Sequence, residues 1–250
     1  DLQDAAKAAG IVADVAVDLL VAGRSGVPLN EALALAQLVD KLPNLKFRGL
    51  LAYDGGAQHI AGFVNRKTQA LKTFEPVVEV YDKMKASGLN LEIFSGGGTG
   101  TYDMMQEVPG FTDIQIGSYL FMDRQYIEIG GEKNETVFDD FSPSLTVMTT
   151  IVSSHFTNKY VTDAGSKAMT LTKPPAIVIG EPGIVYGSGG DEYGAASFDA
   201  PLSRQYKVGD KFELIISHCD PVVNLYDVMY GTRKDKVVSV IPILARGKSQ

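Results

Sequence analysis

The 250-residue sequence has a single cysteine, which excludes a disulfide bond within it. Such a composition fits a reducing compartment, and we expect a cytoplasmic protein. No apolar run reaches the ~18 uninterrupted residues that a membrane-spanning helix needs. The first ten residues also lack the basic flank and the apolar middle of a secretory signal. We therefore expect no association with a membrane.

Clustered positive charge is also missing. The net charge is −7, and lysine and arginine form no basic patch that would bind nucleic acid. The shares of hydrophobic residues, 45%, and of charged residues, 21%, are typical of a soluble globular protein. The length allows one large domain or two of ordinary size. Nucleic acid is therefore not expected as a partner.

The first part of the chain alternates helical and strand patterns. Residues with the composition or the apolar spacing of helices cover 2–9, 29–42 and 61–87. Apolar runs of strand length cover 12–21, 47–53, 91–97 and 113–119. Buried strands that alternate with amphipathic helices predict a parallel α/β sheet or barrel.

After about residue 142 the pattern changes to short β-rich runs, which Gly, Pro and Asp turns separate. Residues 227–242 have the pattern of a hairpin with a charged connection. These features are typical of a closed or sandwiched β domain. The polar, turn-rich segment 130–143 predicts the boundary, so we assign residues 1–140 to the α/β part and 141–250 to the β domain.

The length of the α/β part limits what it can form. An eight-unit barrel needs ~200 residues or more, whereas about 140 residues precede the β domain. They suffice for four or five βα units. Either this part is a smaller open sheet, or the sequence lacks the beginning of a barrel.

A glycine-rich stretch, FSGGGTGTYD at residues 94–103, follows one of the predicted strands. Glycines allow backbone N–H groups to converge on an anion, and a helix start adds its dipole. The stretch lacks the Lys-Ser/Thr of a triphosphate loop. The next strand ends in a second set, Gly117, Ser118 and Tyr119. Because parallel strands end side by side, both sets can hold one phosphate; the alternative is a flexible turn.

Two other strand exits carry polar side chains. LAYDGGAQHI places Tyr53, Asp54, Gln58 and His59 at the same predicted edge. A histidine near a bound phosphate ligand is a credible general base, because its pKa is close to neutral. Arg24 in AGRSGV can contact an anion or stack on a ring. The alternative is that His59 and Arg24 are ordinary surface residues.

The stretch SHCDP contains a histidine, the single cysteine and an aspartate side by side. Strand alternation predicts that His218 and Asp220 face one side and Cys219 the other. An imidazole nitrogen and a carboxylate oxygen suit a divalent ion such as Mn²⁺ or Zn²⁺, with water or substrate as further ligands. Cys219 is then a buried thiol, and His155, which has no partner in sequence, is structural.

Taken together, these stretches resemble the D-threonine aldolase / D-serine dehydratase family. The motifs are AGRSGV, AYDGGAQH, SGGGTGTYD, IGSYLFMD, DAGSKA, GDEYG and SHCDPVVNLYD. The family consists of fold type III pyridoxal-phosphate enzymes related to alanine racemase. The resemblance implies a (β/α)8 TIM-type barrel that binds the cofactor, a C-terminal β domain that carries a metal pair, and a homodimer.

The resemblance also implies roles for individual residues. His59 faces the substrate as the catalytic base. Arg24 and Tyr53 lie beside the cofactor ring, with Gln58 nearby. The divalent ion, expected to be Mn²⁺ with Zn²⁺ or Mg²⁺ as alternatives, is held by His218 and Asp220. The phosphate is held by Ser95, Gly96, Gly97, Gly98, Thr99, Gly117, Ser118 and Tyr119.

The second metal ligand indicates the reaction. Dehydratases of this family tend to have cysteine at that position, whereas the aldolases have aspartate, as here with Asp220. The resemblance therefore implies cleavage of D-threonine and related D-3-hydroxy amino acids to glycine and an aldehyde. The alternatives are a 3-hydroxyaspartate aldolase and a D-serine or 3-hydroxyaspartate dehydratase.

The sequence departs from the family pattern in three ways. Asp54 and Tyr193 stand where the family usually has histidine. The family's cofactor-binding lysine lies in an N-terminal Lys-Thr-His-Lys-like motif that nothing here matches, and Lys7 has the context of a surface residue. We therefore expect these residues to be the larger, C-terminal part of the enzyme. The alternative is an inactive binding protein that lacks the lysine.

Overall fold

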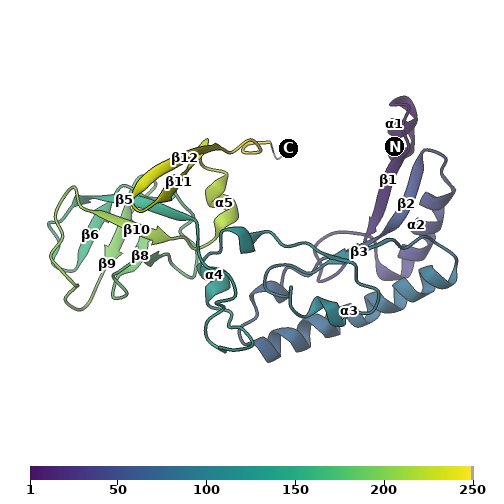
Figure 1. The fold of residues 1–250 in the computed structure, drawn as a ribbon, viewed down its shortest axis with the longest axis horizontal. Coiled ribbons are helices and arrows are strands. Elements are labelled where there is room, and N and C mark those ends of the chain that lie inside the picture. The colour runs from purple at the N-terminus through teal and green to yellow at the C-terminus, as the bar shows by residue number, and fades with distance from the viewer. Residues whose placement is uncertain (249–250) are drawn as a thin grey trace. The chain divides into compact units, whose positions relative to one another are not determined.

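The computed structural model describes residues 1–248 and divides into two compact units (Figure 1). Unit 1 consists of Asp1–Gly117 with Ile129–Phe138, and unit 2 of Ser118–Glu128 with Asp139–Gln250. Each unit has a hydrophobic core of its own. No helix among the described residues has the length and apolar character needed to cross a bilayer.

Unit 1 alternates strands and helices as the sequence predicts. Its elements are α1 (Leu2–Ala8), β1 (Ala13–Asp18), α2 (Leu29–Lys41), β2 (Leu45–Ala52), η1 (Ala57–His59), α3 (Phe63–Ala86), β3 (Ile93–Gly96), η2 (Met105–Glu107) and β4 (Asp113–Ile114).

The four strands of unit 1 form a parallel sheet in the order β1-β2-β3-β4. Neighbours in the sheet are therefore neighbours in the chain, which is the order of a βα barrel and not of a doubly wound sheet. Figure 1 shows α2 and α3 side by side, and α2 also packs on β1 and β2. The parallel α/β architecture predicted from the sequence is confirmed.

Helix α2 shows why the pattern predicts this packing. Its buried residues, Ala32, Ala36 and Val39, are spaced four and three apart and therefore line one face of the helix. Two of the three are alanines without exposed surface, which allows the helix to approach its neighbours closely. The helix then ends at Lys41, directly before Leu42 and Pro43.

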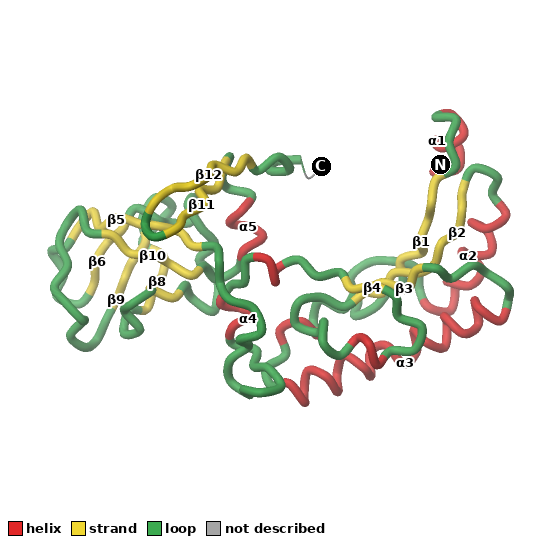
Figure 2. Tube along the Cα trace, in the orientation of Figure 1, coloured by secondary structure: helices red, strands yellow, loops and turns green. Residues whose placement is uncertain are grey.

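Unit 2 consists mostly of strands and loops (Figure 2). Its elements are η3 (Ser118–Leu120), α4 (Arg124–Ile127), β5 (Thr146–Ser153), β6 (Lys159–Thr162), β7 (Ile177–Val178), β8 (Val185–Ser188), β9 (Gly194–Ser197), β10 (Lys211–Ile215), α5 (Cys219–Val223), β11 (Val228–Arg233) and β12 (Lys236–Pro242).

Six of these strands form a sheet in the order β7-β10-β5-β6-β9-β8. Its pairings are antiparallel, and the two end strands, β7 and β8, contact each other, so the sheet curls like a barrel. Phe212 and Leu214 alternate with exposed residues along β10 and point into the core. β11 and β12 form the predicted hairpin. The sequence does not predict β8 and β9, because their segments, VYGS and GAAS, contain glycine and small residues and lack an apolar run.

Candidate functional site

The candidate residues of unit 1 lie where the parallel strands end. β1 leads to Arg24, β2 to Tyr53 and His59, β3 to the glycine-rich loop 97–101, and β4 to Gly117. Because parallel strands point the same way, these four exits share one edge of the sheet. The sequence predicted this arrangement from the order of the elements.

Arg24 and Tyr53 contact each other across two adjacent strand exits. The guanidinium carbon lies 5.0 Å from the centre of the tyrosine ring, within the range of a cation–π interaction. Arg24 is exposed and Tyr53 is half-buried. A flat cationic group beside an aromatic ring suits the predicted position next to a heteroaromatic cofactor.

The buried side chain of Gln58 connects the segment after β2 to the glycine-rich loop. Its side-chain nitrogen donates to the carbonyl of Asp54 at 3.0 Å and to the hydroxyl of Thr101 at 3.1 Å. Its side-chain oxygen accepts from the N–H of Gly100 at 3.0 Å. The residue is 1% exposed. The side-chain amide of Gln58 therefore holds the segment after β2 against the glycine-rich loop. The sequence did not predict this structural role.

Asp54 and His59 mark the two ends of a short turn. The carboxylate of Asp54 accepts the N–H of Ala57, the first residue of the 3-10 turn η1, at 3.1 Å. His59 is the last residue of that turn, and its side chain is exposed. The aspartate that departs from the family pattern thus shapes the turn that presents His59.

The glycines of the loop after β3 have no room for side chains. A Cβ atom on Gly96 would lie 2.0 Å from the carbonyl oxygen of Ala52, and one on Gly100 would lie 2.1 Å from that of Gln58. Gly97 has a φ of 58°, which favours glycine. Three of the five residues of the loop 97–101 are glycines, a composition that suits the predicted phosphate cradle.

Other predicted phosphate residues support this loop or lie outside it. Ser95 is buried at the end of β3 and accepts from the side chain of Gln115 at 3.2 Å. Ser118 and Tyr119 belong to unit 2, where Tyr119 packs edge-on against Phe141 with ring centres 5.5 Å apart. A joint role of these two with the glycine-rich loop stays a prediction.

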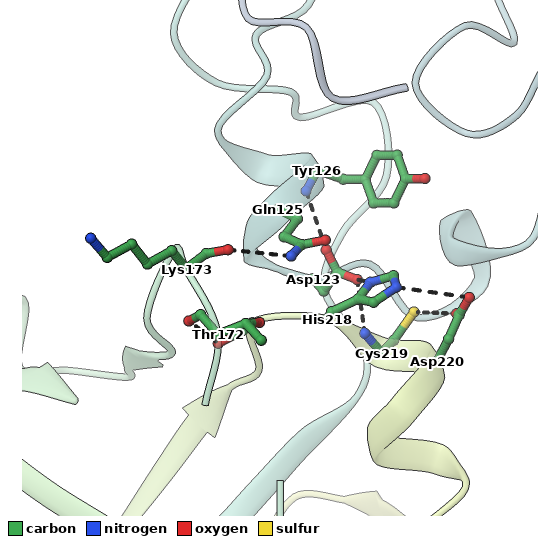
Figure 3. A network of polar contacts seen from close by, with 9 residues as sticks. Asp123, Gln125, Tyr126, Thr172, Lys173, His218, Cys219 and Asp220 are labelled. Atoms are coloured by element: carbon green, nitrogen blue, oxygen red, sulfur yellow. Dashed lines mark hydrogen bonds and ion pairs between the residues drawn. The ribbon is translucent and has the colours of Figure 1, made fainter. Parts of the chain in front are cut away.

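The candidate metal ligands of unit 2 form a chain of contacts (Figure 3). Nδ1 of His218 lies 3.0 Å from a carboxylate oxygen of Asp123, and Nε2 lies 3.9 Å from a carboxylate oxygen of Asp220. Figure 3 shows the imidazole ring between the two carboxylates. His218 is half-buried, Asp123 is buried, and Asp220 is exposed.

The predicted strand through these residues is wrong. β10 ends at Ile215, and His218 is the N-cap of α5, which begins at Cys219. Pro221 lies in the first turn of α5, a position that proline tolerates well. His218 and Asp220 nevertheless approach each other, because the chain turns from a strand into a helix at this point.

Asp123 holds this turn together, and the sequence reading did not single it out. One carboxylate oxygen accepts from His218 and from the N–H of Cys219 at 2.9 Å, and the other accepts the N–H of Tyr126 at 3.2 Å. It therefore caps the starts of both α4 and α5. The only signal in the sequence is its place in the motif IGSYLFMD, followed by a short helical stretch.

Because Nδ1 of His218 contacts Asp123, Nε2 is the ring nitrogen that can bind a metal ion. The hydrogen bond to Asp123 raises the pKa of His218, although burial opposes it. Burial raises the pKa of Asp123, but hydrogen bonds from His218, Cys219 and Tyr126 outweigh it and keep the pKa below its usual value. A carboxylate behind an imidazole in this way fixes the ring and increases its basicity as a ligand.

A divalent ion fits the pair His218 and Asp220. Two donors at bond lengths of about 2.1 Å in a tetrahedral arrangement lie roughly 3.4 Å apart, close to the 3.9 Å between these two atoms. Asp123, His218 and Cys219 also form a compact cluster. The thiol is a poor ligand there, because burial raises the pKa of Cys219 far above its usual value and its S–H donates to Asp220.

Comparisons with known proteins identify related domains in both units. Residues 1–125 match the family described as "Alanine racemase, N-terminal domain", and residues 144–232 match the "Putative serine dehydratase domain". The first match covers half of the chain.

Two curated relatives are similar along nearly the whole chain. A 3-hydroxy-D-aspartate aldolase from Paracoccus denitrificans (strain Pd 1222) is 35% identical over 99% of this chain and 64% of its own length. A D-threonine aldolase from Arthrobacter sp is 33% identical over 97% of this chain and 63% of its own length. The chain thus spans a little less than two thirds of these relatives.

Solved structures share the fold. The crystal structure of D-threonine aldolase from Filomicrobium marinum is 29% identical and covers 100% of this chain and 67% of that chain, with a TM-score of 0.92. D-threo-3-hydroxyaspartate dehydratase from Delftia sp. HT23 is 18% identical and covers 96% and 68%, with a TM-score of 0.77, which indicates the fold alone. The predicted fold class is confirmed.

Proposed function

Since the chain belongs to the alanine-racemase-like family that includes D-threonine aldolases and D-serine dehydratases, we propose that the protein is a pyridoxal-phosphate- and divalent-metal-dependent aldolase. It cleaves D-threonine and related D-3-hydroxy amino acids to glycine and an aldehyde. We further propose that it works as a homodimer in the cytoplasm.

One observation carries the choice of an aldolase. The carboxylate of Asp220 lies 3.9 Å from the imidazole of His218, whereas the neighbouring thiol is buried and protonated. The position at which dehydratases of the family tend to have cysteine therefore supplies an oxygen donor. Nitrogen and oxygen donors favour Mn²⁺, with Zn²⁺ or Mg²⁺ as alternatives. The ion, when bound, supplies a Lewis acid for the substrate hydroxyl group.

In unit 1, the residues at the strand ends bind the cofactor. The glycine-rich loop holds the phosphate, and Arg24 and Tyr53 flank the ring. The cofactor, when bound, supplies an electron sink for the carbon whose bond is cleaved. Gln58 and Asp54 keep the two loops in register, as their hydrogen bonds within the unit indicate.

His59 is the proposed base. Its side chain is exposed at the end of η1, and an imidazole nitrogen is a group that can accept a proton. It takes the proton of the substrate 3-hydroxyl, directly or through a water molecule, while the carbon–carbon bond breaks. The substrate atom that loses the proton thus becomes the carbonyl oxygen of the aldehyde.

Metal removal tests the proposal. The purified protein is incubated with pyridoxal phosphate and D-threonine, and acetaldehyde and glycine are measured before and after chelation and after addition of Mn²⁺. We expect cleavage to stop on chelation and to return with Mn²⁺. Cleavage that continues unchanged in chelator rules out the metal role. Pyruvate and ammonia in place of an aldehyde identify a dehydratase instead.

A second substrate has specific support. A relative that is 35% identical is named 3-hydroxy-D-aspartate aldolase, and so is another that is 32% identical. The two substrates share the bond to be cleaved and differ in the group on the hydroxyl-bearing carbon. Competition assays with both, with glyoxylate and acetaldehyde measured separately, give the ratio of kcat/KM. A protein that binds the cofactor and cleaves neither substrate matches the inactive alternative.

A further inference from the structure

Arg66 is a charged side chain completely buried in unit 1. It lies in the first turn of α3, has no exposed surface, and is the largest side chain buried to this degree. A buried cation is unfavourable unless hydrogen bonds replace its water. The positions of these hydrogen bonds therefore indicate what the residue does.

The guanidinium group donates to four main-chain carbonyl oxygens. Nε donates to Gly100 at 2.6 Å, and one terminal nitrogen donates to Ile60 at 3.0 Å and to Ile129 at 2.9 Å. The other terminal nitrogen donates to Gly130 at 2.7 Å. Three separate segments of unit 1 thus meet at one planar group.

Two of these segments carry the proposed chemistry. Gly100 belongs to the glycine-rich loop, and Ile60 directly follows His59. At Gly100 the N–H is bound by Gln58 and the carbonyl by Arg66, so the peptide planes on both sides of this residue are held. A loop that is held at its far end keeps its remaining amides in a constant direction.

We propose that Arg66 is a positioning residue, which holds the loop 97–101 in its phosphate-binding conformation and couples it to the turn that ends in His59. The inference rests on the proposed phosphate role of this loop. It requires the fork of the guanidinium group and not the charge alone, because a lysine ammonium cannot reach carbonyls in four directions with a fixed planar geometry.

Affinity for the phosphate group tests the inference. Pyridoxamine 5′-phosphate and pyridoxamine serve as probes, because neither needs to form an imine with a lysine in order to bind. Equilibrium dialysis gives the affinity of the protein for each probe. We expect the wild-type protein to prefer the phosphorylated probe, and Arg66→Lys and Arg66→Met to reduce this preference by about tenfold or more. General destabilisation of the protein would weaken the binding of both probes equally, so the ratio of the two affinities reports on the loop.

A matched control is available in the same sheet. Arg48 forms ion pairs with Asp14 and Glu92 near the amino ends of the strands, opposite the candidate site. Arg48→Met makes the same type of substitution at a different arginine, and we expect it to leave the ratio of affinities unchanged. A wild-type protein that does not distinguish the probes overturns the proposed phosphate site. A preserved ratio in Arg66→Met, or full rescue by Arg66→Lys, overturns the positioning role alone.

A measurement on the wild-type protein keeps the inference testable if the variants do not fold. The N–H of Gly62 donates at 2.8 Å to the carbonyl of Ile129, which Arg66 also binds. If Arg66 couples the segments, pyridoxamine 5′-phosphate slows hydrogen exchange at Gly62 as well as in the loop 97–101. Slower exchange in the loop with no change at Gly62 contradicts the coupling.

Discussion

Gln58 and His59 are adjacent in the sequence, yet the structure gives them opposite environments. The side chain of Gln58 is buried and hydrogen-bonded to Asp54, Gly100 and Thr101, whereas that of His59 is exposed. The difference arises because η1 turns the chain by roughly 120° for each residue. One neighbour therefore maintains the loops, and the other lies exposed at the end of the turn.

The variants Gln58→Leu and His59→Gln separate these two tasks. Leucine leaves the N–H of Gly100 and the carbonyl of Asp54 without partners, so the free energy of unfolding falls by about 2–4 kcal/mol. His59→Gln removes the proposed base, and we expect it to abolish aldol cleavage. Urea unfolding and aldehyde release measure the two effects. Aldehyde release that persists in His59→Gln, or unchanged stability in Gln58→Leu, contradicts the assignment.

Asp123 illustrates how one carboxylate sets the properties of a neighbouring ligand. It is the first cause of the raised pKa of His218, and a protonated imidazole cannot bind a metal ion. Mn²⁺ affinity therefore falls as the pH drops through this raised pKa, which is above the usual value of about 6.5.

Asp123→Asn changes both the strength and the pH dependence of metal binding. Loss of the orienting carboxylate weakens Mn²⁺ binding by about 10–100-fold at high pH. The midpoint of the pH dependence moves to lower pH, because the histidine pKa is no longer raised. Titration calorimetry over a pH series measures both. Cys219→Ala is the control and retains the affinity; an equal loss there identifies the thiol as a ligand.

At the scale of elements, the conformation of the glycine-rich loop depends on close contact between its backbone and the backbone of neighbouring segments. Gly100 lies against the carbonyl of Gln58, whereas a Cβ atom on Gly117, at the end of the next strand exit, meets nothing within 4 Å. Both residues belong to glycine-containing motifs, and only the structure distinguishes the crowded glycine from the open one.

The pair Gly100→Ala and Gly117→Ala makes this difference measurable. A Cβ atom at Gly100 would lie 2.1 Å from a carbonyl oxygen, so the loop must move. We expect a loss of about 1–3 kcal/mol in the free energy of unfolding and weaker binding of pyridoxamine 5′-phosphate. Gly117→Ala changes stability by less than about 0.5 kcal/mol. Thermal unfolding of both variants checks this; a destabilised Gly117→Ala contradicts it.

At the scale of the whole molecule, metal binding and folding are linked. An ion that binds only the folded protein stabilises it by about 2.7 kcal/mol at a hundred times its dissociation constant. The proposed ligands belong to unit 2, where His218 and Asp220 flank the start of α5. The melting temperature should therefore rise with the concentration of Mn²⁺.

Two histidine variants test this linkage. His218→Gln removes one proposed ligand, and we expect its melting temperature to be independent of Mn²⁺. His155→Gln removes an exposed histidine that follows β5, and we expect the same Mn²⁺-dependent rise as in the wild-type protein. Calorimetry with and without Mn²⁺ gives the comparison. A rise that survives in His218→Gln places the ion elsewhere.

The sequence by itself determined the class of the fold, the alternation of strands and helices, and the edge at which the candidate residues gather. These properties follow from periodicity, because a helix or a buried strand repeats its apolar pattern over many residues. The family motifs also come from the sequence alone. They indicated His218 and Asp220 correctly as neighbours in space, although the predicted strand between them is a helix start.

Only the tertiary structure decided which polar residues are used to hold the loops and which remain exposed. Gln58, Arg66 and Asp123 owe their roles to partners 42, 34 and 95 positions away. No local pattern encodes such contacts, because they arise where segments from different parts of the chain are packed together. The burial of a single polar residue is therefore set by its neighbours in space and not by its neighbours in sequence.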